Sequence, residues 1–171
     1  MKITKLSEQV STMMEKATYD PWANTVFAGW KTLHNSTKGA IGEQLIEEFF
    51  TSKNSVVTPR SDAGHDRIID GFRTEIKFSL AVNAKTGQNE PIFNHISLEK
   101  SWDILILCYV DINDMTLKGC WAFKEDFKDF FHMLKKQQGG KKSDNDDFMI
   151  GGMRYYREVF ESGYFGDLND L

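Results

Sequence analysis

The chain has 171 residues, 40% of them hydrophobic, and a formal net charge of −4. These values predict one globular domain with its own core. The acidic balance excludes a broadly basic nucleic-acid coat but leaves room for a local basic site. No apolar run approaches the ~20 residues of a membrane span and the first residues lack a signal-peptide pattern, so we expect a soluble, cytoplasmic protein without membrane contact. Cys108 and Cys120 have no His or Cys partner at metal spacing and are expected as reduced core residues.

The first part of the chain predicts two amphipathic helices. Apolar side chains recur at helical spacing in residues 2–18 and again in residues 38–54. In the second helix Gly39 and Gly42 fall on the apolar face, where small residues would allow close packing against a neighbour. That face consists of Ile41, Leu45, Ile46, Phe49 and Phe50. We therefore expect this helix to cover a sheet.

Strand signals dominate the middle of the chain. Asp70-Gly71 predicts a two-residue hairpin turn, because such a turn needs positive φ angles that Gly and Asp tolerate. Further along, we expect a polar loop of weak structure (81–101), a strand buried on both faces (102–111), another strand (117–123), a helix (124–136), a charged Gly-rich linker (137–147) and one or two edge strands (148–160). This order, without an internal repeat, predicts a mixed α/β arrangement of layers.

The predicted hairpin brings charged side chains together. With Asp70 and Gly71 at the turn, Asp66 lies opposite Glu75, and Lys77 projects to the same face. The other face carries the apolar residues Ile69, Phe72, Ile76, Phe78 and Leu80, which we expect to pack on a helix. Opposed carboxylates repel each other, and a divalent cation removes that penalty.

These groups suit metal-assisted hydrolysis of a phosphodiester. Asp66 and Glu75 could ligate Mg²⁺, with Mn²⁺ as a substitute, while phosphate and water oxygens complete the shell. Lys77 could orient the attacking water or stabilise charge on the scissile phosphate. The alternative is a surface hairpin on which the same residues and Arg73 form solvated ion pairs.

Glu43 is a further candidate for this site. It lies at the border of the apolar face of the predicted helix, so it can reach the edge of the sheet while that face is buried. Glu47 and Glu48 are expected to point elsewhere. A solvated position on the helix surface is the alternative for Glu43.

Several motifs together resemble the PD-(D/E)XK nuclease superfamily. They are Gly64-His65-Asp66, the short hairpin, Glu75-Ile76-Lys77 with Phe78-Ser79, and an upstream helix bearing Gly42-Glu43. The resemblance spans about residues 38–123, and His65 stands where the family pattern has a proline. It implies a restriction-endonuclease-like core, in which a mixed central sheet is flanked by helices. It also implies that Asp66, Glu75 and Glu43 serve the metal and that Lys77 assists the water.

The resemblance leads to further expectations about organisation and partners. One domain would comprise an N-terminal helical segment (1–37), a catalytic core (38–123) and a C-terminal helix with edge strands (124–171). Asn94 and His95 would contact DNA, and Lys141 and Lys142 could contact phosphates from a flap, although a solvated loop is the simpler interpretation.

The resemblance predicts a small type II restriction endonuclease that acts on DNA. One site of this kind cuts one strand, so a double-strand break needs a second copy, and we expect a homodimer. A repair or junction-resolving nuclease is the alternative enzyme. A catalytically idle DNA- or protein-binding module on the same scaffold is the alternative from another class.

Overall fold

The computed structural model describes residues 18–130, 135–136, 147–151 and 153–171. The predicted helix at 2–18 lies almost wholly outside them. The N-terminal half of the described chain contains η1 (Trp30–Thr32), α2 (Asn35–Ser52), β1 (Val57–Pro59), β2 (Arg67–Ile69), β3 (Phe72–Ser79) and β4 (Ile92–Ser97). The C-terminal half contains β5 (Ile104–Val110), β6 (Leu117–Phe123), α3 (Lys124–Phe130), β7 (Lys135–Lys136), β8 (Asp147–Gly151), α4 (Met153–Glu161), β9 (Gly166–Asp167) and η3 (Leu168–Asp170).

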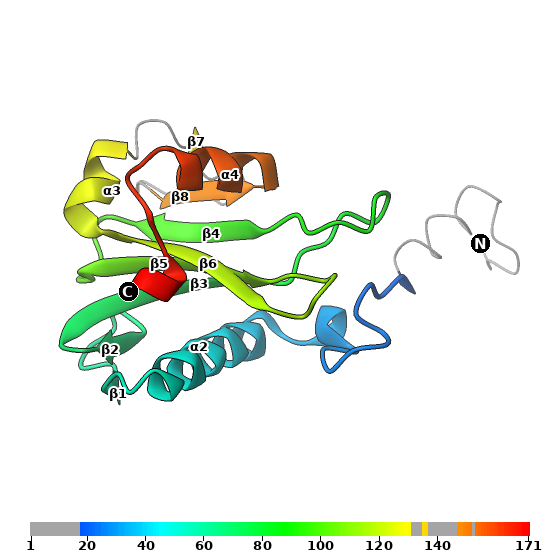
Figure 1. The fold of residues 1–171 in the computed structure, drawn as a ribbon, viewed down its shortest axis with the longest axis horizontal. Helices are drawn as coiled ribbons and strands as arrows, with labels where there is room; N and C mark the ends of the chain where they lie inside the picture. Colours follow the sequence, from blue (N-terminus) through cyan, green and yellow to red (C-terminus); the bar gives the residue numbers. More distant parts are fainter. Residues whose placement is uncertain (1–17, 131–134, 137–146, 152) are drawn as a thin grey trace, which may run out of the picture.

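The fold is mixed α/β and is built on a six-stranded mixed sheet in the order β1-β2-β3-β5-β6-β9. The strands β1, β2 and β3 pair antiparallel, β5 runs parallel to β3, and β6 runs antiparallel to β5. Figure 1 shows α2 on one side of this sheet and the small sheet β4-β8-β7 with α4 on the other. None of the helices among the described residues is long and apolar enough to cross a membrane.

The predicted hairpin is confirmed. Ile69 pairs with Phe72 and Arg67 with Thr74, and both turn residues adopt positive φ, 48° at Asp70 and 88° at Gly71. Phe72 is expected in the core but is 43% exposed, because it is the first residue of β3, beside the hairpin turn, where it packs edge-on against Phe123.

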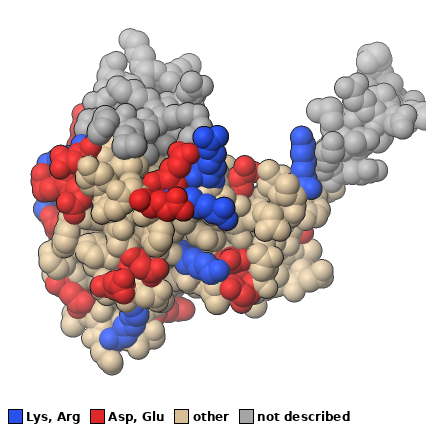
Figure 2. Space-filling view, turned by 45° about the horizontal axis from the view of Figure 1, so that its top comes forward, with Lys and Arg blue, Asp and Glu red and all other residues tan. Residues whose placement is uncertain are grey.

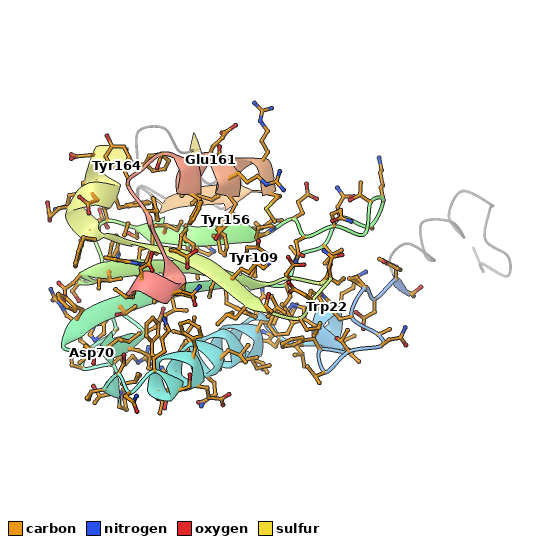
Figure 3. All side chains as sticks on the ribbon, in the orientation of Figure 1. Trp22, Asp70, Tyr109, Tyr156, Glu161 and Tyr164 are labelled. Atoms are coloured by element: carbon orange, nitrogen blue, oxygen red, sulfur yellow. The ribbon has the colours of Figure 1, made fainter. Side chains whose placement is uncertain are left out.

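Strand β5 alternates between two cores. Ile104, Ile106 and Cys108 pack with Ile46 and Phe50 of α2. The alternate residues Leu105, Leu107 and Tyr109 pack under the small sheet and α4. Every residue of β5 is buried, as its continuous apolar run predicts. In Figure 3 the second core is marked by Tyr109 and Tyr156, whose ring centroids lie 5.3 Å apart.

Three predicted elements differ from the structure. The supposed loop 81–101 contains β4, because Phe93 and Ile96 find an apolar surface to cover on the large sheet. The helix predicted for 124–136 is α3, which ends at Phe130 within the described part, and Lys135 and Lys136 pair with β8. The predicted edge strands at 148–160 are one strand, β8, followed by helix α4, in which Tyr156 and Val159 are buried at helical spacing.

Candidate active site

Asp66 directly precedes β2, at the position where the pairing of β2 with β3 begins. The ladder between these strands reaches Arg67 and Thr74, and the backbone N–H of Asp66 still donates to the carbonyl of Thr74 at 2.9 Å. Beyond that point the Asp66 side chain takes over, because its Oδ2 accepts the backbone N–H of Ile76 at 2.8 Å. The carboxylate is thereby fixed at the edge of β3, beside Glu75.

His65 anchors the chain just before this carboxylate. Its ring is buried, Nε2 accepts the backbone N–H of Ser61 at 3.2 Å, and Nδ1 lies 3.3 Å from Oδ1 of Asp62. His65 therefore places a packed, hydrogen-bonded side chain directly before Asp66 and restrains the chain that leads to it.

Glu75 is completely buried and is held by two lysines. Its Oε1 accepts the ammonium of Lys77 at 2.6 Å and that of Lys100 at 2.8 Å. Its Oε2 is buried and has no hydrogen-bond partner in the part of the chain that the structure describes. An unpartnered buried carboxylate oxygen is costly, so this atom marks a place where a cation would be stabilising.

The surroundings of Asp66 disfavour its negative charge. Burial raises the pKa of the Asp66 carboxyl, and the nearby charges of Glu75 and Glu43 raise it further. The hydrogen bond from Ile76 and the charge of Lys77 act in the opposite direction but do not reverse the shift. A carboxyl group with a raised pKa beside another carboxylate is an arrangement that a bound cation relieves.

Glu43 approaches this cluster from α2 but is engaged by an arginine. Nη1 of Arg67 donates to Oε2 of Glu43 at 2.6 Å, and its Nε donates to Oε2 of Glu47 at 3.1 Å. Glu47 is not among the residues that line the cavity around Asp66 and Glu75, as expected. It nevertheless shares Arg67 with Glu43, because the two glutamates are four residues apart on one helix face. Glu48 is exposed and accepts from Gln44, as expected of a residue away from the site.

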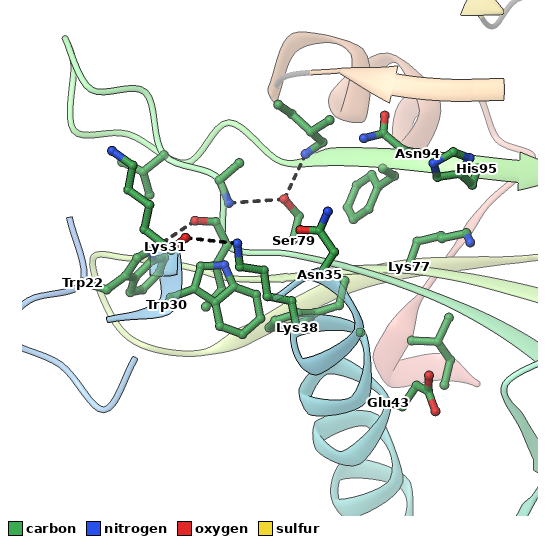
Figure 4. A pocket seen from close by; sticks show the side chains of 18 of the residues that line it. Trp22, Trp30, Lys31, Asn35, Lys38, Glu43, Lys77, Ser79, Asn94 and His95 are labelled. Atoms are coloured by element: carbon green, nitrogen blue, oxygen red, sulfur yellow. Dashed lines mark hydrogen bonds between the residues drawn. The ribbon is translucent and has the colours of Figure 1, made fainter. Parts of the chain in front are cut away.

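The four predicted residues Glu43, Asp66, Glu75 and Lys77 line one cavity of about 790 Å³. Figure 4 shows it from close by, with Glu43 on α2 and Lys77 on β3. The cavity continues along β3 to an aromatic wall that includes Trp22 and Trp30. The structure thus brings the predicted charged residues together at one end of an elongated pocket.

Asn94 and His95 line the same cavity, although they lie on a strand instead of the expected loop. Oγ of Ser79 accepts the backbone N–H of Ile92 at 3.0 Å, which ties the start of β4 to the end of β3 (Figure 4). The ladder between β4 and β8 shifts register between Phe93 and Ile96, and His95 has a φ of 56°. Both side chains are exposed at this irregular segment. Lys141 and Lys142 lie outside the described residues.

The donor set fits a hard divalent cation bound by two carboxylates. Asp66 and Oε2 of Glu75 supply oxygens, and the carbonyl of Ile76 faces the same edge as its N–H, because both groups of a strand residue point to one side. Among the described residues no group of three His, Cys, Asp or Glu side chains is placed to hold a metal ion. Glu43 could therefore act only through an intervening water or after leaving Arg67. Mg²⁺ suits such a site, since it commonly takes one or two carboxylates and keeps several waters.

Sequence reasoning missed Arg67 and Lys100. Arg67 carried a usable signal, since it shares a hairpin face with Ile69 and would meet the helix that bears Glu43 and Glu47. The sequence held no such signal for Lys100, because this residue lies in the β4–β5 connection, whose position depends on tertiary packing.

A scan against protein-family models and a search of curated proteins each find no match. The functional assignment therefore rests on the residues and their geometry.

Proposed function

We propose that this protein is a Mg²⁺-dependent endonuclease of the PD-(D/E)XK type that hydrolyses phosphodiester bonds in DNA. The observation that carries the proposal is the unequal pairing of the two carboxylate oxygens of Glu75. One oxygen of this buried carboxylate is shared by Lys77 and Lys100, and the other has no hydrogen-bond partner among the described residues, next to the fixed carboxylate of Asp66. A structural ion pair would leave no such oxygen, because burying it without a partner is unfavourable.

The chain's own residues can perform most of what hydrolysis requires. When bound, Mg²⁺ would polarise the phosphate and lower the pKa of a water. Asp66 and Glu75 are held by hydrogen bonds, so they need little reorganisation. Lys77, only 16% exposed, places an ammonium where negative charge develops as the water oxygen bonds to phosphorus and the ester oxygen leaves.

The topology supports the same assignment. A helix bearing Glu43 precedes an antiparallel β1-β2-β3 unit, and β5 lies parallel beside β3 in a mixed sheet. The departure is on the second face of the sheet, where the small sheet and α4 take the place that the family gives to helices. This departure leaves the arrangement of Asp66, Glu75 and Lys77 unaffected.

The specific form of the proposal is a restriction endonuclease that acts as a homodimer, since one such site cuts one strand and a double-strand break needs two. On the face shown in Figure 2, the lysines and arginines lie in separate groups beside acidic residues. Contacts to DNA phosphates would then be concentrated near the pocket and would not extend along a broad basic surface. A repair or junction-resolving nuclease would use the same chemistry on DNA of a particular shape.

An idle binding module is the second candidate. It is favoured by the ion pairs of Arg67 with Glu43 and Glu47, which neutralise part of the acidic cluster without a metal. Such a protein would bind nucleic acid or another protein without cutting.

The deciding experiment incubates the purified full chain with plasmid DNA, phage DNA, branched DNA and a labelled RNA in Mg²⁺ or Mn²⁺. Discrete DNA fragments indicate a sequence-specific endonuclease, and a smear indicates a non-specific one. Selective cutting of branched DNA indicates a junction-resolving enzyme. Lys118→Ala is the control, because Lys118 pairs with Asp111 and Asp114 outside the pocket. DNA left intact by the wild type contradicts the proposal.

A further inference from the structure

The second lysine on Glu75 is more than the buried carboxylate needs. Lys77 and Lys100 contact the same oxygen, Oε1, although one ammonium would suffice to neutralise the side chain. Both lysines line the pocket that contains Asp66. The Lys100 side chain is 38% exposed against 16% for Lys77, so Lys100 has the freer access to anything that enters the pocket.

The backbone of Lys100 is held firmly while its side chain reaches the pocket. The ammonium of Lys124 donates to the carbonyl of Lys100 and lies 5.0 Å from the ring centroid of Trp102. The neighbouring Ser101 donates to Asp62 at 3.1 Å, and Nε1 of Trp102 donates to the carbonyl of Ser97 at 2.8 Å. A long side chain on a fixed backbone can exchange one oxygen partner for another without any rearrangement of the backbone.

Charge balance indicates what the new partner would be. The balance is taken over the groups that surround Glu75 and Arg67. When Asp66 is ionised, the carboxylates of this set exceed its cations by one: Asp66, Glu75, Glu43 and Glu47 stand against Lys77, Lys100 and Arg67. A divalent cation reverses that excess and leaves one positive charge, which one phosphodiester group cancels. The cation would also compete with both ammonium groups for the charge of Glu75.

We propose that Lys100 is a second catalytic lysine, which turns from Oε1 of Glu75 to an oxygen of the phosphate being cut. The inference rests on the proposed function. The contact forms no covalent bond. It is a charge-assisted hydrogen bond from the ammonium to a non-bridging phosphate oxygen, and it stabilises the charge that builds up as water attacks phosphorus.

The first measurement is the rate of plasmid cleavage at saturating Mg²⁺. Lys100→Ala should lower the rate constant at least about 10-fold, as expected for loss of one charged contact in the transition state. Lys100→Arg should recover part of it. Lys118→Ala, whose side chain is 43% exposed and lies outside the pocket, should remain at the wild-type rate.

A second measurement separates contact with substrate from support of Glu75. In a calorimetric titration without DNA, Lys100→Ala should bind Ca²⁺ at least as tightly as the wild type, because a positive charge beside the carboxylates has been removed. In Ca²⁺, a labelled duplex with a neutral methylphosphonate at the mapped cut position should bind the wild type more weakly than unmodified DNA. The same modification should weaken binding to Lys100→Ala much less.

The outcomes distinguish this inference from the proposed function. A wild type that leaves DNA uncut overturns both. A cutting wild type with an equally active Lys100→Ala variant overturns the role of Lys100 alone. A variant whose loss of cleavage matches a loss of Ca²⁺ affinity also overturns it, since Lys100 would then only hold Glu75 in place.

Discussion

Asp66 accepts the backbone N–H of Ile76 through Oδ2 at 2.8 Å, across ten residues of sequence. This contact replaces the strand partner that β3 lacks beyond the first residue of β2. It holds one carboxylate beside Glu75 without help from a cation. The site is therefore built before it binds anything, and the repulsion between the two carboxylates is part of the folded protein.

Divalent cations should stabilise the wild type through this pair. At about 100 times the dissociation constant, binding contributes about 2.7 kcal/mol, which raises Tm by roughly 5–10 °C in a domain of this size. Asp66→Asn should lose most of that rise in Mg²⁺ or Ca²⁺, and Glu48→Gln on α2 should keep it. Differential scanning calorimetry provides the measurement. A wild-type Tm that stays unchanged in millimolar Mg²⁺ and Ca²⁺ would show that the carboxylates do not form a metal site.

The raised pKa of Asp66 predicts how stability depends on pH in the metal-free protein. Between 3.8, the ordinary value for an Asp carboxyl, and the higher folded-state pKa, the folded protein binds more protons than the unfolded chain. The contribution of protonated Asp66 is present below 3.8 and is lost as pH rises through the folded-state pKa. Relative to Asp66→Asn, the wild type should therefore lose stability with rising pH in this window. Urea unfolding in EDTA at a series of pH values measures the effect.

Asp103 provides a control of opposite sign for that experiment. Its hydrogen bonds with Arg73 hold the pKa of the Asp103 carboxyl below its ordinary value. Its contribution is present above 3.8 and is lost as pH falls through the folded-state pKa. Relative to Asp103→Asn, the wild type should gain stability as pH rises through that range. The same direction for both variants would contradict the assignment.

Lys77→Ala should separate chemistry from binding. Glu75 keeps Lys100 on Oε1, so the carboxylate should stay in place when Lys77 is removed. We expect cleavage to fall by about 100-fold or more, as for loss of a preorganised charge-stabilising group. DNA binding in Ca²⁺, followed by gel shift, should change little, because one ammonium is a small part of the phosphate contact. Equal losses of binding and cleavage would make Lys77 a docking residue.

Glu43→Gln tests the helix contribution. We expect Mg²⁺-dependent cleavage to fall about 10-fold, or ~1.4 kcal/mol of transition-state stabilisation, while Glu48→Gln stays near the wild type. The variant Arg67→Ala tests whether Glu43 acts on the cation, because it releases Glu43 from its ion pair with Arg67. If Glu43 serves the cation, Arg67→Ala should bind Ca²⁺ more tightly and Glu43→Gln more weakly. Matching losses in both variants would show that Glu43 only anchors Arg67.

The local parts of the fold were predictable from the sequence because short-range signals determine them. Asp70-Gly71 specifies the hairpin through its φ requirement, and the apolar runs of β5 and β6 are long enough to identify strands. The pairing of Asp66 with the edge of β3 near Glu75 follows from the hairpin register. The grouping of these two residues with Lys77 therefore follows from local geometry.

The missed parts depend on contacts between distant segments. Strand β4 lacks a clear alternation of apolar residues, because Asn94 and His95 are exposed in succession between the buried Phe93 and Ile96. Helix α4 shares its residue types with strands, and the buried pair Tyr156 and Val159 becomes informative only once β5 is in place. Lys100 reaches Glu75 through this same tertiary arrangement.

The glycines of α2 provide the last prediction, which concerns the packing that places Glu43. Both Gly39 and Gly42 were expected to allow close approach, but the structure requires only Gly42 to be small. A Cβ at Gly42 would meet the side chain of Phe78 next to its own backbone, whereas a Cβ at Gly39 would have nothing within 4 Å. Gly42→Ala should therefore push α2 away from β3 and cost about 1–3 kcal/mol as overpacking.

Gly39→Ala is the matched variant on the same helix. It should stabilise the protein by up to about 1 kcal/mol, because alanine is the better helix former and meets no obstacle. Urea unfolding of both variants measures these changes. Since Glu43 lies one residue beyond Gly42, Gly42→Ala should also weaken cleavage, while Gly39→Ala should leave it unchanged. Two alanine variants of equal stability would contradict the close contact between α2 and β3 on which the position of Glu43 depends.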